Sequence, residues 1–251
     1  MRVLHLIGIG AGDRDQVTVQ AVKAMNTVDV FFVIDKGNPK QGLVDVRTEI
    51  LAEHVTREHR VVEIEDPPRD RTPADYGNAV DDWHARRAAR ISDAIAAEPE
   101  DAVGAILVWG DPSLYDSTIR VIERILALGR VGFDYDVIPG VTSVSALAAQ
   151  HRIVLNRVGE AVHVTTGRNL RDHGLPEGVD AAVVMLDSDC SFTALPEWDI
   201  WWGANLGTAD AREVAGRVAD VVDEIERVRA EVKSRAGWVM DTYLVRRSRL
   251  S

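Results

Sequence analysis

A turn of Gly110, Asp111 and Pro112 carries the clearest combination of residue types for ligand chemistry. It follows the apolar run 103–108, which predicts a buried strand. Glycine lets a ligand approach the backbone closely, proline stiffens the turn, and aspartate offers a fixed acceptor. Ligands of open α/β sheets bind beyond the carboxyl ends of the strands. The turn is therefore placed to contact a small molecule, although the same residue types also make ordinary tight turns.

A second turn, 139–143, leads into a helix expected over 144–150. Backbone N–H groups at the start of a helix lack partners within it and can hold polar parts of a ligand. Thr142 or Ser143 could serve there, or could simply cap the helix.

A third turn, with Gly8 and Gly10, follows the first apolar run of the chain. Strand, glycine turn and helix is the opening of a nucleotide-binding unit, but Asp13 stands where the dinucleotide fingerprint needs its third glycine. Asp35 closes a second apolar run and could imitate the acidic residue that binds a ribose. A nicotinamide-dependent dehydrogenase is therefore one alternative.

Other common chemistries find no support in the sequence. The 7 histidines show no metal-ligand spacing and Cys190 stands alone, so no metal site is predicted. A G-x-S-x-G elbow and a Walker A loop are both missing from the sequence. What remains is an enzyme that needs neither a metal nor a covalent intermediate, or a binding protein.

Basic side chains gather on the long helix expected over 74–97, where Arg86 and Arg87 are neighbours. A solvated helix face is the plain interpretation. The functional interpretation is a basic rim for a substrate with several carboxylates, formed by Arg86, Arg87, Arg90, Arg69, Arg71, Lys36 and Arg47.

Composition bounds the class of protein. The chain has 251 residues, 46% of them hydrophobic, which suits a globular protein of one large or two small domains. A formal net charge of −11 argues against a general nucleic-acid surface. The sequence shows no signal peptide and no apolar run long enough to span a bilayer, so we expect a cytoplasmic protein without membrane association.

Strands and helices alternate along both halves, which predicts an α/β fold of two α/β domains, 1–117 and 118–251, joined near 116–120. The elements expected from periodicity are strands over 3–9, 28–34, 60–64, 103–108, 134–138, 162–165, 181–186, 200–205 and 238–245, and helices from 18 and over 43–55, 74–97, 119–128, 144–150 and 210–235.

Three stretches occur in one order: GIGAGDRD (8–15), VWGDPSLY (108–115) and IPGVTSVSALAA (138–149). Together they resemble the tetrapyrrole methylases, the S-adenosylmethionine enzymes of sirohaem and corrin biosynthesis. Ala11 departs from the family pattern, which usually has proline there. Four further stretches, FVIDKG (32–37), ADYGNAVDDWHARRA (74–88), WWGANLGT (201–208) and GWVMDTYLVRR (237–247), resemble the branch that methylates C-1 of precorrin-5 and releases its acetyl group as acetate, giving precorrin-6A.

The resemblance implies a homodimer whose cofactor, S-adenosyl-L-methionine with S-adenosyl-L-homocysteine as product, lies in a cleft between the two domains, the substrate trough being on the N-terminal side. Carried over by position, the cofactor contacts are Ala11, Trp109, Gly110, Asp111, Leu114, Thr142, Ser143, Leu186 (or Met185 if the register shifts by one), Gly203, Ala204, Asn205 and Leu206.

Loss of the acetyl group requires water to add to a carbonyl and a carbon–carbon bond to break, so a general base and an oxyanion donor are expected. Candidates by residue type are Asp35, His84, Asp111, Tyr115 and Asp241. The substrate's carboxylates would suit Lys36, Arg47, Arg86 and Arg87. Besides the dehydrogenase, the alternatives are another tetrapyrrole methylase of the corrin pathway and a corrinoid-binding protein without turnover.

Overall fold

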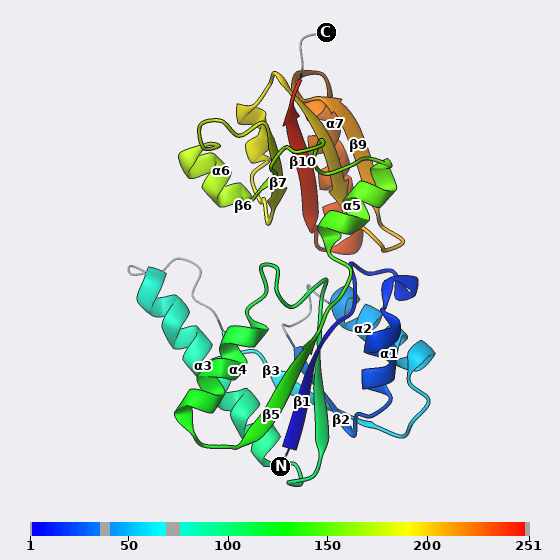
Figure 1. The fold of residues 1–251 in the computed structure, drawn as a ribbon, viewed down its shortest axis with the longest axis vertical. Helices are drawn as coiled ribbons and strands as arrows, with labels where there is room; N and C mark the ends of the chain where they lie inside the picture. Colours follow the sequence, from blue (N-terminus) through cyan, green and yellow to red (C-terminus); the bar gives the residue numbers. More distant parts are fainter. Residues whose placement is uncertain (1, 36–40, 69–75, 249–251) are drawn as a thin grey trace. The chain divides into compact units, whose positions relative to one another are not determined.

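The computed structural model describes residues 2–35, 41–68 and 76–248. The chain divides into two compact units. Unit 1 comprises Met1–Gly10 and Arg14–Val141, and unit 2 comprises Ala11–Asp13 and Thr142–Ser251. Each unit has its own sheet and its own buried hydrophobic clusters, so each is described by itself (Figure 1).

Unit 1 is built on a parallel sheet with the strand order β3-β2-β4-β1-β5. The central strand β1 pairs with β4 on one side and with β5 on the other. Parallel strands all end at the same edge, so the loops that follow them lie together. The strands are β1 (Arg2–Gly8), β2 (Val30–Asp35), β3 (Arg60–Glu65), β4 (Val103–Val108) and β5 (Phe133–Ile138).

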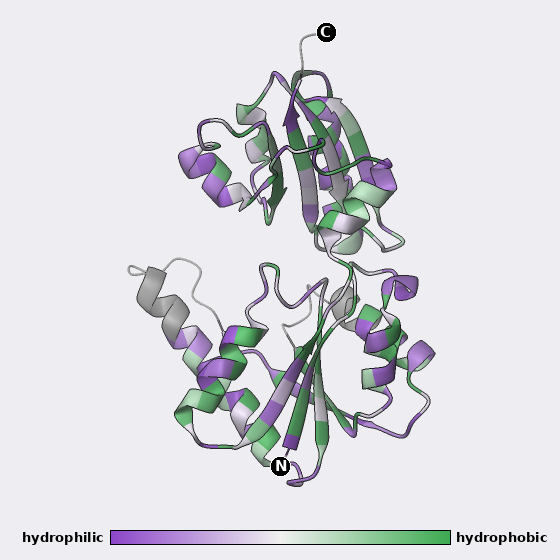
Figure 2. Ribbon diagram, in the orientation of Figure 1, coloured by the Kyte–Doolittle hydropathy of each residue, from purple (hydrophilic) through white to green (hydrophobic). Residues whose placement is uncertain are grey.

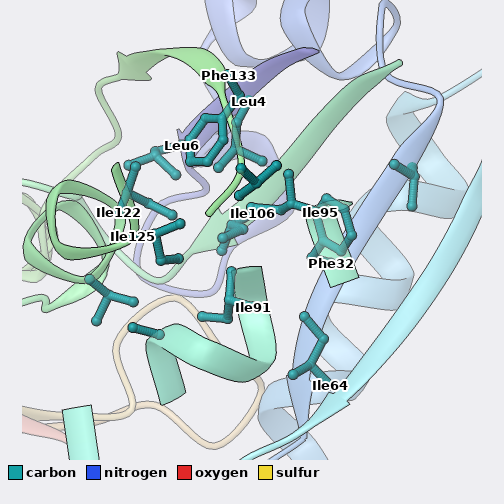
Figure 3. Packing of buried hydrophobic residues seen from close by; sticks show 14 of the residues in the cluster. Leu4, Leu6, Phe32, Ile64, Ile91, Ile95, Ile106, Ile122, Ile125 and Phe133 are labelled. Atoms are coloured by element: carbon teal, nitrogen blue, oxygen red, sulfur yellow. The ribbon is translucent and has the colours of Figure 1, made fainter. Parts of the chain in front are cut away.

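Helices cover both faces of this sheet, as a parallel sheet requires (Figure 1). Residues of β1 and Ile9, which follows it, divide between two cores: Leu4 and Leu6 belong to one, Ile7 and Ile9 to the other. Figure 3 shows the first core, in which Leu4 lies close to Phe133. The helices are α1 (Val19–Met25) and α2 (Gln41–His54) on one face and α3 (Tyr76–Ala96) and α4 (Thr118–Leu128) on the other, with a short 3-10 turn at Arg14–Gln16.

Unit 2 contains a mixed sheet with the order β6-β7-β10-β8-β9. Only β6 and β7 pair in parallel among the described strands of this sheet. Figure 2 colours β7 as mostly hydrophobic and shows many hydrophilic residues along α6, while β7, β8 and β10 contribute buried residues to the core of this unit. The elements are α5 (Ser143–His151), β6 (His163–Thr166), α6 (Gly167–His173), β7 (Ala181–Met185), η3 (Ser191–Ala194), β8 (Trp198–Ala204), β9 (Arg212–Arg217), α7 (Val218–Ala236) and β10 (Asp241–Arg247).

The α/β fold with two domains is confirmed, but the boundary between the compact units differs from the expected one. The expected boundary at 117/118 would separate α4 and β5 from the first unit, whereas the observed one lies at 141/142. The reason is that β5 pairs with β1 along its whole length, from Arg2↔Phe133 to Ile7↔Ile138. This long-range pairing leaves no local trace in the sequence.

The expected helix over 210–235 is wrong in its first part. Arg212–Arg217 forms the edge strand β9, and the helix begins only at Val218. Val214, Val218 and Val221 are spaced as in a helix, so periodicity extended the helix too far. Pairing with β8 overrides that local preference. The expected strand from Trp238 likewise begins only at Asp241, and α6 was not predicted.

Among the described residues, none of the helices combines the length and the apolar character needed to cross a bilayer.

Candidate active site

Three glycine-containing strand ends meet at the carboxyl edge of the unit 1 sheet. A Cβ built on Gly140 would lie 2.1 Å from the carbonyl oxygen of Gly110, and one on Gly8 would lie 2.5 Å from the Gly140 nitrogen. The backbones of Gly10 and Gly110 exchange two hydrogen bonds, with N···O distances of 3.2 and 2.7 Å. Glycine is required here for close backbone packing.

Asp111 joins two of these turns. Its Oδ2 accepts a hydrogen bond from the Gly140 N–H at 2.9 Å, and its Oδ1 accepts from the Ser113 N–H at 2.8 Å and from the Ser113 hydroxyl. Burial alone would raise the pKa of Asp111, but these hydrogen bonds outweigh it and hold the pKa below its usual value. A carboxylate stabilised in this way is a poor general base.

The rest of the turn has open space and an unusual backbone. Gly110 has φ +70°, and a Cβ there would meet nothing within 4 Å, so a ligand could approach. Trp109 and Leu114 are half-buried beside it. Tyr115 is exposed and has φ +52°, a strained conformation of the kind that clusters at functional sites. Partial burial raises the pKa of the Tyr115 phenol, so it stays protonated near pH 7 and could act as a donor.

In unit 2, the residues predicted to contact the cofactor gather at one edge of the sheet. Antiparallel pairing sets the end of β7 and the end of β8 beside the start of β10, with Met185 opposite Thr242 and Ala204 opposite Asp241. The start of α5 joins them, because the Ser143 hydroxyl accepts a hydrogen bond from the Thr242 hydroxyl at 3.0 Å.

The first glycine turn lies against the same edge. A Cβ on Gly207, just after β8, would come within 2.7 Å of the Asp13 nitrogen and 3.2 Å of the Ala11 carbonyl carbon. Residues from four separate stretches of sequence are thus brought together in unit 2: Ala11; Thr142 and Ser143; Met185 and Leu186; and Gly203, Ala204, Asn205 and Leu206.

Leu186 has the features most typical of a residue that contacts a ligand. It directly follows β7, has φ +55°, and leaves 60% of its surface exposed. A left-handed backbone is costly for a leucine, and its exposed apolar side chain gains little from the protein. Met185 is half-buried within the strand.

Other predicted contacts have evident structural roles. Thr142 caps α5 by accepting a hydrogen bond from the Ser145 N–H at 3.1 Å. Asn205 is buried with φ +48°, and its side chain accepts from the Met240 N–H at 2.8 Å. These roles shape the edge and are compatible with ligand contacts through the backbone.

The arginines predicted to bind substrate differ in their surroundings. Arg87 is buried, donates to Asp66 Oδ2 at 2.9 Å and lies over the Trp83 ring at 4.4 Å. Arg86 is exposed and its Nη2 donates to the Pro68 carbonyl at 3.4 Å. The geometry therefore favours a structural role for Arg87.

Arg47 reaches the end of β4, where its Nε donates to the Leu107 carbonyl at 3.3 Å. Burial lowers the pKa of this guanidinium, and the charge of Asp116 partly offsets that effect. The residues of the predicted basic rim that lie outside the described residues are Lys36, Arg69 and Arg71. Asp35 is described only as the last residue of β2.

Two of the candidate acid–base residues, His84 and Asp241, lie among the described residues, one in each unit. His84 is half-buried on α3, with its ring 4.8 Å from that of Trp83. Asp241 is buried, which raises its pKa, and its Oδ2 accepts hydrogen bonds from Arg229 at 2.9 Å and from Trp202 at 3.4 Å. Asp241 is therefore engaged inside unit 2.

A buried polar cluster around Asp187 was missed by the sequence reasoning. Its carboxylate accepts hydrogen bonds from the Tyr243 hydroxyl at 2.7 Å, from the Ser191 hydroxyl at 2.9 Å and from the Ser191 N–H at 2.7 Å. It also accepts from the Asp189 N–H, two residues ahead, at 3.0 Å. This bond is an Asx-turn pattern, which could have marked Asp187 as a local brace.

Within the described residues, histidine, cysteine, aspartate and glutamate side chains form no group of three placed to hold a metal ion. The lone thiol belongs to Cys190, which is buried beside Asp187, and burial raises its pKa to about 11. It is therefore a poor nucleophile at neutral pH.

Known proteins resemble this chain along most of its length. A family model for the Tetrapyrrole (Corrin/Porphyrin) Methylases matches residues 3–222. A precorrin-6A synthase (deacetylating) from Sinorhizobium sp. is 48% identical over 251 residues, covering 98% of this chain and 96% of that protein.

Solved structures agree at the level of the fold. A putative cobalamin synthesis related protein (CobF) from Corynebacterium diphtheriae superposes with a TM-score of 0.83 at 35% identity, covering 98% of both chains. A uroporphyrin-III C-methyl transferase from Thermus thermophilus, complexed with S-adenosyl homocysteine, superposes with a TM-score of 0.59 at 18% identity and covers 96% of this chain and 91% of that one. At that identity the second similarity concerns the fold alone.

Proposed function

The chain belongs to the tetrapyrrole (corrin/porphyrin) methylase family, and from this premise we propose that it is an S-adenosylmethionine-dependent C-methyltransferase of corrin biosynthesis. Its reaction is the methylation of C-1 of precorrin-5 with release of the acetyl group as acetate, which gives precorrin-6A. The observation that carries the proposal is 48% identity to a precorrin-6A synthase (deacetylating) over nearly the full length of both chains.

The arrangement of unit 2 supports binding of the methyl donor. S-adenosylmethionine supplies a methyl group on a sulfonium centre, and its transfer to carbon needs alignment and exclusion of water more than acid–base groups. Leu186 offers an exposed apolar side chain at the same end of the sheet as the backbone of 203–206, with the start of β10 between them, and Ser143 begins α5 there. These groups suit the apolar and the polar parts of such a molecule.

In unit 1, the turn at Gly110 is the other proposed contact. Asp111 holds this turn to Gly140, so Trp109, Gly110 and Leu114 keep a fixed shape. That the cofactor also contacts this turn is part of the proposal and rests on the family resemblance.

Acetyl loss needs a base, and the geometry narrows the candidates. Both oxygens of Asp111 and one of Asp241 are occupied by hydrogen bonds. Asp111 and Asp241 are therefore set aside as the base, which leaves Asp35 and His84 as proposed bases by residue type and Tyr115 as a proposed donor to the oxyanion. Arg47 and Arg86 are the proposed partners of substrate carboxylates.

A nicotinamide-dependent dehydrogenase fits less well. Gly8 and Gly10, the first glycines of its fingerprint, pack against the backbones of Gly140 and Gly110. Their small size is explained by this contact, so no pyrophosphate is needed to account for them.

The proposal includes a homodimer in the cytoplasm, as the family resemblance implies. Light scattering of the purified chain tests the assembly directly: a dimer mass is expected, and a monomer at working concentration would refute it.

The decisive activity experiment supplies the chain with S-adenosylmethionine and precorrin-5. We expect acetate and S-adenosylhomocysteine to accumulate in equal amounts, together with a product of the mass of precorrin-6A. Methylation without acetate would instead indicate another methylase of the corrin pathway. Binding of the corrinoid with neither product would indicate a binding protein.

A further inference from the structure

Residues 240–243, at the start of β10 and just before it, hydrogen-bond to three segments of unit 2. These segments are the start of α5, the turn after β7 and the turn after β8. Residues of β10 were not among the predicted cofactor contacts. Met240, Thr242 and Tyr243 are here called the β10 brace.

Met240 fixes the turn after β8. Its N–H donates to Asn205 Oδ1 at 2.8 Å, and its carbonyl accepts from the Asn205 N–H at 2.8 Å. This reciprocal pair holds Asn205 in its left-handed conformation, with φ +48°. The path of residues 203–206 therefore depends on the backbone of Met240, the residue that precedes β10.

Thr242 fixes the start of α5. Its hydroxyl is buried and donates to the Ser143 hydroxyl at 3.0 Å. A buried hydroxyl without a partner is costly, so this bond sets the distance between α5 and the sheet.

Tyr243 points to the opposite face of the sheet, since successive side chains of a strand alternate. Its hydroxyl donates to Asp187 Oδ2 at 2.7 Å. Asp187 directly follows Leu186, and its carbonyl accepts from Arg229 at 3.0 Å. Gly167 packs so closely on this residue that a Cβ there would lie 2.4 Å from Asp187 Cγ. The strained backbone of Leu186 is thus held from its C-terminal side.

We propose that Thr242 and Tyr243 are positioning residues for the methyl donor, which set the spacing of the α5 start and the Leu186 turn through the Ser143 and Asp187 contacts. The inference rests on the proposed function. Thr242 and Tyr243 act through Ser143 and Asp187 and need not touch the ligand. Loss of either hydroxyl widens the range of distances among the three segments, which weakens binding of a ligand that contacts them all.

The test measures binding of S-adenosylhomocysteine by calorimetry at 10 °C to the full chain and to two variants. Thr242→Val and Tyr243→Phe each remove one hydroxyl with little change of volume. We expect each to raise the Kd about three- to tenfold, the size of one lost hydrogen bond. Thr242→Ser keeps the hydroxyl and should bind within about twofold of the unmodified chain.

Matched controls separate positioning from general loss of stability. Thr165→Val removes another buried threonine hydroxyl from the same sheet, and Tyr135→Phe removes a tyrosine hydroxyl from unit 1. Both controls should leave the Kd unchanged even where they lower the melting temperature. In turnover assays, Thr242→Val and Tyr243→Phe should raise the KM for S-adenosylmethionine more than they lower kcat.

The possible outcomes are distinct. Absence of S-adenosylhomocysteine binding to the unmodified chain would refute the proposed function and this inference with it. Tight binding to the unmodified chain and equally tight binding to both brace variants would refute the inference alone. If Thr242→Val does not fold, Tyr243→Phe carries the same test, because it deletes a single oxygen atom.

Discussion

At the scale of single residues, Asp111 accepts three hydrogen bonds that close one turn and tie it to the next. An acidic residue in a ligand-binding turn invites a catalytic interpretation, but a carboxylate held by several N–H and O–H donors is stabilised in its ionised form. Its contribution is to the shape of the turn.

Replacement Asp111→Asn should lower the free energy of unfolding by about 1 kcal/mol at pH 7, because an amide cannot accept all of these hydrogen bonds. The folded-state pKa of Asp111 is below its ordinary value of 3.8, so the ionised carboxylate adds stability above that value. The addition is lost as the pH falls through the folded-state pKa. Urea unfolding should therefore show that the free energies of unfolding of the unmodified chain and of Asp111→Asn become equal in acid. A difference between them that persists unchanged in acid would contradict a stabilising role of the ionised Asp111 carboxylate.

Arg87 is a second residue for which the sequence suggested ligand binding and the geometry favours a structural role. Arg87→Ala should lower the free energy of unfolding by about 3 kcal/mol, because it leaves the carboxylate of Asp66 without its buried partner. Arg86→Ala, at an exposed neighbour, should change it by less than about 0.5 kcal/mol. Denaturant titrations measure the free energy of unfolding of both variants. An Arg87→Ala variant as stable as the unmodified chain but with a higher KM for the substrate would instead support a role of Arg87 in substrate binding.

At the scale of elements, the apolar runs predicted most strands of both sheets, and Thr18 was correctly placed at the start of α1. Local periodicity carries this information. It carries none on which strands pair, so the assignment of β5 to unit 1 and the edge strand β9 escaped prediction. The clustering of cofactor positions from four stretches of unit 2 depends on the same long-range pairing.

The three glycine strand ends of unit 1 give a sharp prediction at this scale. Gly140→Ala should destabilise the chain by about 3 kcal/mol, since its Cβ would overlap the backbones of Gly110 and Gly8. Gly132→Ala is the matched control, because a Cβ there meets nothing within 4 Å. Thermal unfolding should show a lower melting temperature for the first variant only. Equal stability of the two would mean that the strand ends are less tightly packed.

At the scale of the whole molecule, the chain combines a net charge of −11 with a proposed substrate that carries several carboxylates. Binding must then depend on local basic groups, of which Arg47 lies at the end of β4. The cofactor contacts remain a proposal, and the family resemblance was needed to make it. Physical patterns alone marked the glycine turns but did not distinguish a methyl donor from a dinucleotide.

Calorimetric titration of the full chain with S-adenosylhomocysteine, and separately with NADH, tests the central claim most directly. The account predicts saturable binding of about one S-adenosylhomocysteine per chain and no heat from NADH beyond dilution. Binding of NADH without binding of S-adenosylhomocysteine would contradict it.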